Sequence, residues 1–172
     1  NNEVDPYDIE RLGHLVARLS KEIKIQKCLL NSDFLYPEEN DSFTVKQVIM
    51  EIQDVFSPLN LSFRIRYSVE DHLLERGLTC DFFLLTRVLI NMVKNAVEAS
   101  KQGGEILVRA TSNNDSMLFS VWNAGKIREE VIGRVFQRNI STKPGLGHGL
   151  GTYSMKLFGE KILGGQVEFH ST

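Results

Sequence analysis

The sequence predicts an α+β domain, a two-layer α/β sandwich of helices packed on a sheet, preceded by a long N-terminal helix of the coiled-coil type. Three observations lead to this fold class. Apolar residues near the N-terminus recur in alternating steps of three and four. A long segment rich in apolar residues at helical spacing lies in the middle of the chain. Two strand-like segments joined by a short turn follow it, and together they indicate helices and antiparallel strands in one fold.

Composition places the chain among ordinary globular proteins. Of its 172 residues, 42% are hydrophobic and 24% are charged, close to the averages for that class. A net charge of −2 without a basic block argues against a nucleic-acid partner. No apolar run approaches the ~20 residues that cross a bilayer, so we expect no membrane contact by this chain. Cys28 and Cys80 lie in no metal-ligand spacing, and no signal peptide precedes them, which predicts a cytoplasmic location even if a larger parent protein is anchored.

The first expected element is a helix that opens at Pro6. Its apolar seam consists of Ile9, Leu12, Val16, Leu19, Ile23 and Leu30. Three regular heptads favour a helix of an intersubunit bundle, and a surface helix packed on its own domain is the alternative. A polar, proline-containing stretch then separates residues 1–36 from a second domain at residues 41–172.

The second domain is expected to mix helices and strands. In chain order we predict a short strand around Phe43, a helix over Val45–Phe56, a strand over Leu61–Val69, a helix capped by Asp81 that reaches about Ser100, the strands "EILVRATS" and "SMLFSVWN" about the turn "NND", a short helix near Arg128–Val135, a helix over Leu150–Ile162, and a last strand "GQVEFHS".

Within the long helix, Arg87, Asn91 and Asn95 are four residues apart and therefore share one face. Apolar residues cover most of the remaining circumference, so this helix is expected to be largely buried. Buried amides need partners, and Asn91 and Asn95 could bond to neighbouring backbone or to each other. An amide oxygen is also a good ligand for Mg²⁺, which makes Asn95 a candidate metal ligand.

Two further segments could bind a ligand. "VWNAG" places Asn123 and Gly125 at the end of a strand, where an amide oxygen could accept from a purine amine, although the same residues also form ordinary turns. The run "NISTKPGLGHGLG" has neither the spacing of a P-loop nor that of GxGxxG after a strand. Its glycines lead into the first turn of a helix, where free N–H groups and the helix dipole favour an anion.

These segments in this order, an NxxxNA helix, an N-x-G corner, "VFQRNISTK" and "GLGHGLGT", resemble the ATP-binding catalytic domain of bacterial sensor histidine kinases. That family belongs to the Bergerat-fold ATPases, and the match runs from about Phe43 to Ser171. The resemblance implies that the helix from Pro6 is the second helix of the family's dimerisation and phosphotransfer hairpin, and that the chain forms a homodimer through it.

The resemblance also implies roles for individual residues. Asn95 would hold Mg²⁺, and Asn91 would line the phosphate side of an ATP site, with Lys94 and Arg87 nearby. Catalytic roles would fall to Asn91, Lys94 and Lys143, the last reaching the terminal phosphate. The remaining nucleotide contacts would come from Asn123 at the adenine, Gly125 beside it, Phe136 at the hinge of a lid, and Thr142, Gly145, Gly147, Gly149, Leu150 and Gly151 around the phosphates.

The sequence departs from the family in two respects. The family usually has Asp at the place of Asn123. The first helix of the hairpin, which carries the phosphoacceptor histidine, has no counterpart here, and His14 lies on the wrong helix and precedes Leu15 instead of an acidic residue. We therefore expect that this chain does not autophosphorylate alone.

The residue at position 91 distinguishes ATP hydrolysis from phosphoryl transfer. Related ATPases of the gyrase and MutL types carry a Glu four residues before the metal-binding Asn to activate water, whereas this chain has Asn91, and an amide cannot act as a general base. The prediction is therefore ATP-dependent phosphoryl transfer to a histidine on a dimerisation helix, with a response regulator as the later partner. Two alternatives stay open: a degenerate nucleotide fold that serves as a dimeric interaction module, and a hydrolytic ATPase.

Overall fold

The computed structural model describes residues 6–30, 36, 39–59, 62–113, 116–138 and 150–171. They belong to two compact units, Asn1–Glu38 and Glu39–Thr172. Within the described residues, no helix combines the length and the apolar character that crossing a bilayer requires.

The first unit contains one long helix, α1, which spans Pro6–Leu30. It begins at the predicted proline, whose missing N–H is not needed at a helix start. All six apolar side chains of the predicted seam are more than half exposed: Ile9, Leu12, Val16, Leu19, Ile23 and Leu30. The helix itself is confirmed, and its pairing with a second copy stays a prediction.

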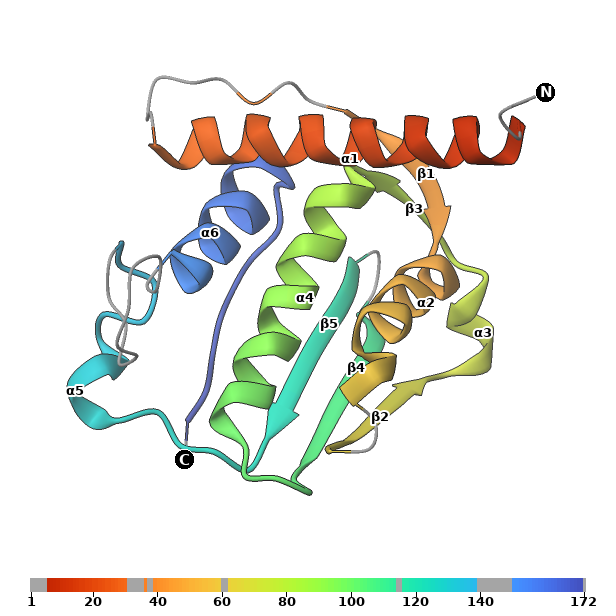
Figure 1. Ribbon diagram of the computed structural model, residues 1–172. Helices are drawn as coiled ribbons and strands as arrows, with labels where there is room; N and C mark the ends of the chain where they lie inside the picture. Colours follow the sequence, from red (N-terminus) through yellow and green to blue (C-terminus); the bar gives the residue numbers. More distant parts are fainter. Residues whose placement is uncertain are drawn as a thin grey trace. The chain divides into compact units, whose positions relative to one another are not determined.

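The second unit mixes short and long elements (Figure 1). In chain order they are β1 (Asp41–Thr44), α2 (Val45–Phe56), the 3₁₀ turn η1 (Ser57–Leu59), β2 (Arg64–Val69), α3 (Asp71–Leu74), β3 (Gly77–Cys80), α4 (Phe82–Ala99), β4 (Glu105–Asn113), β5 (Ser116–Asn123), α5 (Glu129–Ile132), α6 (Gly151–Lys156) and η2 (Leu157–Ile162).

The strands form two sheets. β1 pairs antiparallel with β3, and the larger sheet has the order β2-β4-β5. β4 and β5 form the predicted antiparallel hairpin, in which Ile106 lies opposite Asn123. β2 and β4 run parallel, a pairing that was not predicted from the sequence. The chain returns between them through α3, β3 and α4, and such a long crossover is what a parallel pair requires.

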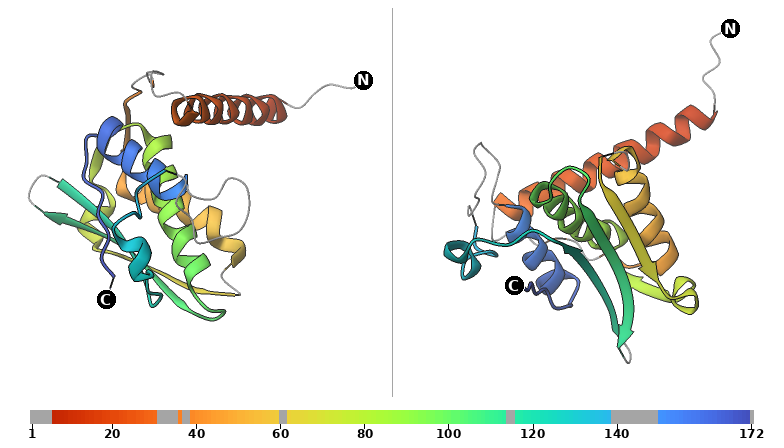
Figure 2. Two further views of the ribbon diagram at one scale, coloured as in Figure 1. Left: turned by 90° about the vertical axis from the view of Figure 1, so that its left-hand side faces the viewer. Right: turned by 90° about the horizontal axis from the view of Figure 1, so that it is seen from below.

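One face of the larger sheet carries the core, and helices α2 and α4 cover it (Figure 2). The buried members of this core are Phe43, Val45, Val48, Ile49, Ile52, Phe56, Leu89, Val93, Val108 and Ala110. On the other face of the sheet, Leu118 and Trp122 of β5 are exposed. The arrangement confirms the predicted two-layer sandwich.

Side-chain caps fix where the two main helices begin. Thr44 and Gln47 form a capping box at α2, in which the Gln47 side chain accepts from the Thr44 N–H at 2.8 Å. The Asp81 carboxylate accepts from the Leu84 N–H at 2.8 Å, as predicted for α4. Asp41 of β1 adds a second carboxylate there, because it accepts from the Phe82 N–H at 3.0 Å. The N-terminus of α4 is thereby tied to the small sheet.

The C-terminal part corrects one prediction. α6 continues into a π-helical segment, where the Leu163 N–H donates to the Phe158 carbonyl. The predicted strand "GQVEFHS" has the alternation of a strand, but residues 164–171 are irregular in the structure. Their hydrogen bonds include the one from the Gly165 N–H to the Gly159 carbonyl and the one from the Val167 N–H to the Glu160 carboxylate, and they form no ladder with another described strand.

Candidate functional site

Helix α4 presents the predicted polar row on its less buried side. Arg87, Asn91 and Asn95 are all half-buried, whereas Val88 and Val93, on other sides of the helix, are buried in or beside the core. The four-residue spacing stacks the row along the helix axis. The helix therefore separates a side that holds the fold together from a side that is open to a ligand.

The hydrogen bonds of α4 distinguish these asparagines from the other polar residues of the helix. Thr86 donates to the Phe82 carbonyl at 2.9 Å, and Ser100 donates to the Ala96 carbonyl at 2.7 Å, so both are satisfied by their own helix. Among the described residues, neither the Asn91 nor the Asn95 side chain has a hydrogen-bond partner. The purely structural interpretation, in which the two amides bond to each other or to backbone, thus finds no support in this part of the chain.

The strand corner lies against the end of the same helix. A Cβ placed on Gly125 would lie 2.9 Å from the Ala99 carbonyl oxygen and 3.2 Å from the Ala99 Cβ. The same Cβ would lie 2.7 Å from Nδ2 of Asn123. No positive φ is required at Gly125, so close approach explains the glycine here, and not turn geometry.

This contact brings the two predicted parts of the site together. Ala99 follows Asn95 by four residues and continues the row of Arg87, Asn91 and Asn95 on the same face of α4. One helical turn advances about 5.4 Å along the axis, so the corner residues lie about one turn beyond Asn95. Sequence analysis did not single out Ala99, although its place in the four-residue repeat was readable.

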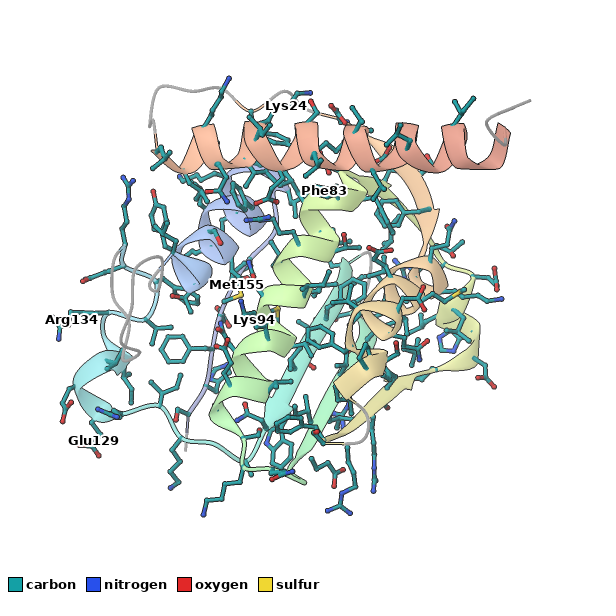
Figure 3. The ribbon with its side chains drawn as sticks, viewed as in Figure 1. Lys24, Phe83, Lys94, Glu129, Arg134 and Met155 are labelled. Atoms are coloured by element: carbon teal, nitrogen blue, oxygen red, sulfur yellow. The ribbon has the colours of Figure 1, made fainter. Side chains whose placement is uncertain are left out.

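Lys94 precedes Asn95 and has an exposed side chain. Figure 3 shows it on the side of α4 where α6 also lies. A mobile ammonium next to a row of neutral amides supplies positive charge without fixing its position. This placement is compatible with a role near an anionic ligand.

Phe136 is anchored by the C-terminal part of the chain. Its ring meets the edge of Phe169 at a centroid distance of 5.5 Å, and the Lys156 ammonium lies 4.7 Å from its centre. Lys156 in turn pairs with Glu160 at 3.1 Å. The hydrogen bond from Lys156, followed by the one from the Val167 N–H, lowers the pKa of Glu160 below its ordinary value.

A hydrogen bond also holds the segment that follows the strand corner of Asn123 and Gly125. The Ile127 N–H donates to the Ser171 hydroxyl at 3.1 Å. With the Phe136 contact, this fixes the chain on both sides of α5 to residues near the C-terminus. Sequence analysis missed Phe169, Lys156 and Ser171, although the i,i+4 spacing of Lys156 and Glu160 was a visible signal.

Of the predicted phosphate cradle, the structure describes only the end. Leu150 precedes α6, and Gly151 is its first residue. A Cβ on Gly151 would meet no atom of the described residues within 4 Å, so packing against this part of the chain does not require a glycine there. Thr142, Lys143, Gly145, Gly147 and Gly149 lie outside the described residues, and their roles stay predictions.

The donor set of the site suits Mg²⁺ better than a softer metal. In the described part of the chain, no group of three or more His, Cys, Asp or Glu side chains could hold a metal ion. The half-buried amide of Asn95, without a partner among these residues, offers a hard oxygen. A single protein oxygen fits Mg²⁺, which usually keeps several waters and is shared with substrate phosphates.

Comparison with known families places the chain in a class. The sequence profile described as histidine kinase-, DNA gyrase B-, and HSP90-like ATPase matches residues 80–172, more than half of the chain. The chain therefore belongs to this family of ATPases. Among curated proteins, none matches it.

Within this class, solved structures similar to this chain include several histidine kinases. The nucleotide-free catalytic domain of the histidine kinase ThkA is 26% identical over 72% of this chain and 82% of that chain, with a TM-score of 0.64. The mycobacterial sensor histidine kinase MprB is 21% identical over 72% of this chain and 80% of that chain, with a TM-score of 0.60. ThkA in complex with the response regulator TrrA is 24% identical over 94% of this chain and 46% of that chain, also with a TM-score of 0.60. The predicted Bergerat fold and the resemblance to the ATP-binding catalytic domains of sensor histidine kinases are confirmed.

Proposed function

We propose that this chain uses Mg-ATP to phosphorylate a histidine on a dimerisation helix, as the catalytic part of a two-component sensor histidine kinase. One observation carries the proposal: the Asn91 and Asn95 amides are half-buried, have no partner among the described residues, and belong to the row that ends at Ala99, on which the strand corner of Asn123 and Gly125 packs. Unpaired amides at this place are the groups that would meet a nucleotide.

In this proposal each part of the site binds one part of ATP. Asn123 faces the base, Asn91 faces the phosphates, and the Asn95 oxygen binds Mg²⁺. When bound there, the ion would screen the charge of the phosphate oxygens. Lys94, Lys143 and the backbone N–H groups from Gly145 to Gly151 would bind and orient the phosphates, with Arg87 close by. In the transfer itself, the bond between the γ-phosphorus and the bridging oxygen breaks, ADP leaves, and a bond to the histidine nitrogen forms.

The composition of the row favours transfer over hydrolysis. Its four positions are Arg87, Asn91, Asn95 and Ala99, none of which is a carboxylate. An amide cannot remove a proton from water, so the row supplies no general base. A neutral imidazole needs no such base and depends mainly on positioning and on neutralisation of the phosphate charge. For this reason we expect little phosphate release from the chain alone.

The partners follow from the same proposal. The exposed apolar seam of α1, which includes Leu12, Val16 and Leu19, supports homodimerisation through that helix. In light scattering, the full chain should then have the mass of a dimer and a protein that starts at Phe43 the mass of a single truncated chain, and a dimer of the truncated protein would refute this part of the proposal. ThkA was solved in complex with the response regulator TrrA, which supports a response regulator as the partner of this chain.

We place the reaction in the cytoplasm. Both Cys28 and Cys80 are free thiols. Burial raises the pKa of each, and the neighbouring Asp81 and Asp41 raise that of Cys80 further. A protonated thiol is oxidised more slowly than a thiolate. Such thiols are consistent with a compartment in which cysteines stay reduced.

Asn95→Ala tests the proposal. Calorimetric titration with ATP should show Mg²⁺-dependent binding by the wild type and its loss in Asn95→Ala, with unfolding curves that stay close together. Asn113→Ala is the matched control, because this asparagine is exposed at the end of β4. If Asn95→Ala keeps Mg²⁺-dependent affinity, the metal assignment is wrong. Steady phosphate release by the wild type would favour a hydrolase, and no binding at all would favour the interaction module.

A further inference from the structure

The side chain of Asn123 has an unsatisfied donor in an unusual place. Its Nδ2 atom is buried, and no described atom accepts a hydrogen bond from it. It lies under the backbone of Gly125, where an added Cβ would come within 2.7 Å of it. A buried donor without a partner costs free energy, so this atom marks a group whose proper partner is not supplied by the described residues.

The surroundings do not decide which way the amide is turned. An asparagine side chain carries one acceptor and one donor of nearly equal size, and a half turn about its last bond exchanges them. Such an orientation is normally set by hydrogen bonds. Among the described residues, no hydrogen bond holds the Asn123 amide in either orientation. The half-buried group can therefore show either its oxygen or its nitrogen to a ligand.

This freedom bears on which base the site can bind. The base of ATP carries an amine at position 6, which donates a hydrogen bond to an amide oxygen. Hypoxanthine and guanine carry an oxygen there, which accepts a hydrogen bond from an amide nitrogen. An ionised carboxylate at the same place could only accept, so it would repel the oxygen at position 6 of these bases.

We infer that Asn123 makes the base pocket permissive, so that the chain binds 6-oxopurine nucleoside triphosphates as well as ATP. The inference rests on the proposed nucleotide site and goes beyond it in the class of substrate. The adaptable amide of Asn123 sets this range, and Asn123→Asp restricts it to 6-aminopurines.

Calorimetric titrations with ATP, ITP and UTP, each with Mg²⁺, test the inference on the wild type and on Asn123→Asp. ITP differs from ATP in the hydrogen-bond pattern of its six-membered ring and lacks the extra amine of GTP, so it reports the pairing at Asn123 without a change in bulk. We expect the wild type to bind ITP within about fivefold of ATP. We expect Asn123→Asp to disfavour ITP relative to ATP by roughly tenfold or more, because a mismatched polar pair is left unsatisfied.

UTP and the unfolding curves serve as controls. UTP should bind at least roughly tenfold more weakly than either purine to the wild type, since a site that reads the base rejects a different one. A wild type that selects ATP over ITP as strongly as Asn123→Asp does would overturn the inference and leave the proposed function intact. Equal binding of UTP would overturn it as well, because the base would not be read. Loss of binding to every triphosphate in a folded wild type would overturn the proposed function and the inference together.

Discussion

Replacing Gly125 with alanine tests the contact that joins the strand corner to helix α4. The added Cβ would lie 2.7 Å from Asn123 Nδ2 and 2.9 Å from the Ala99 carbonyl oxygen. The second of these atoms belongs to the backbone of α4 and cannot move without the helix. The φ of Gly125 lies outside the left-handed region, so the cost of the substitution comes from the clash alone.

Overpacking of this kind typically costs about 1–3 kcal/mol. In a chain of this size, 1 kcal/mol shifts the melting temperature by about 2–4 °C, so Gly125→Ala should melt roughly 2–12 °C lower in scanning calorimetry. Because the corner must move away from α4 to relieve the clash, we also expect its ATP affinity to fall by about tenfold or more, equivalent to about 1.4 kcal/mol.

Gly133→Ala is the matched control for this experiment. Gly133 has helical backbone angles, with φ −68° and ψ −5°, and a Cβ on it would meet no described atom within 4 Å. Alanine at such a position should leave stability unchanged or raise it by about 0.4–1 kcal/mol. If Gly125→Ala matches the wild type in both melting temperature and affinity, the corner is not packed on Ala99 and the site is not assembled as described.

Three further results are expected. Phe136→Leu should lower the free energy of unfolding by about 1–2 kcal/mol in urea, because it removes the edge contact with Phe169; an unchanged midpoint would show that this contact contributes nothing. Asp81→Ala should cost about 1–2 kcal/mol, and Asp81→Asn less, because the amide can still accept from the Leu84 N–H; equal losses in the two variants would argue against capping. Burial raises the pKa of the Cys80 thiol above 9.0, and the neighbouring Asp81 raises it further. As the pH rises past 9.0, the folded chain therefore keeps a thiol proton that the unfolded chain loses. Stability should therefore fall as pH rises through 9.0, and Cys80→Ala should reduce that fall in urea titrations at several pH values.

Local patterns were sufficient to predict most of the fold. The cap at Asp81, the helical spacing of α2 and α4 and the hairpin pairing of β4 with β5 all act over a few residues, and each of these predictions is confirmed. Two short elements, α3 and β3, were missed because four residues carry little periodic signal. The parallel pairing of β2 with β4 depends on a long crossover, which no local pattern encodes.

The candidate site also has a part that could be predicted from the sequence and a part that could not. The row of Arg87, Asn91 and Asn95 follows from helical spacing alone, because a four-residue repeat fixes a common face. The contact of Gly125 with Ala99 could not be predicted, because a glycine after a strand suggests a turn, and only the packed structure shows that a helix end requires its lack of a side chain. The same holds for Phe136, whose ring partners come from a segment near the C-terminus.

One side of helix α4 packs in the core, and another side carries the candidate site residues. Substitutions on the second side can therefore be interpreted as effects on ligand binding. Val93 is fully buried and belongs to the core, whereas Asn91 and Asn95 are half-buried and make no hydrogen bond to described residues. Truncating a buried valine opens a cavity in the core and weakens folding. Truncating either asparagine removes no described hydrogen bond and opens no cavity in that core. Loss of nucleotide affinity in Asn95→Ala, at unchanged stability, would therefore report on ligand binding and not on the fold.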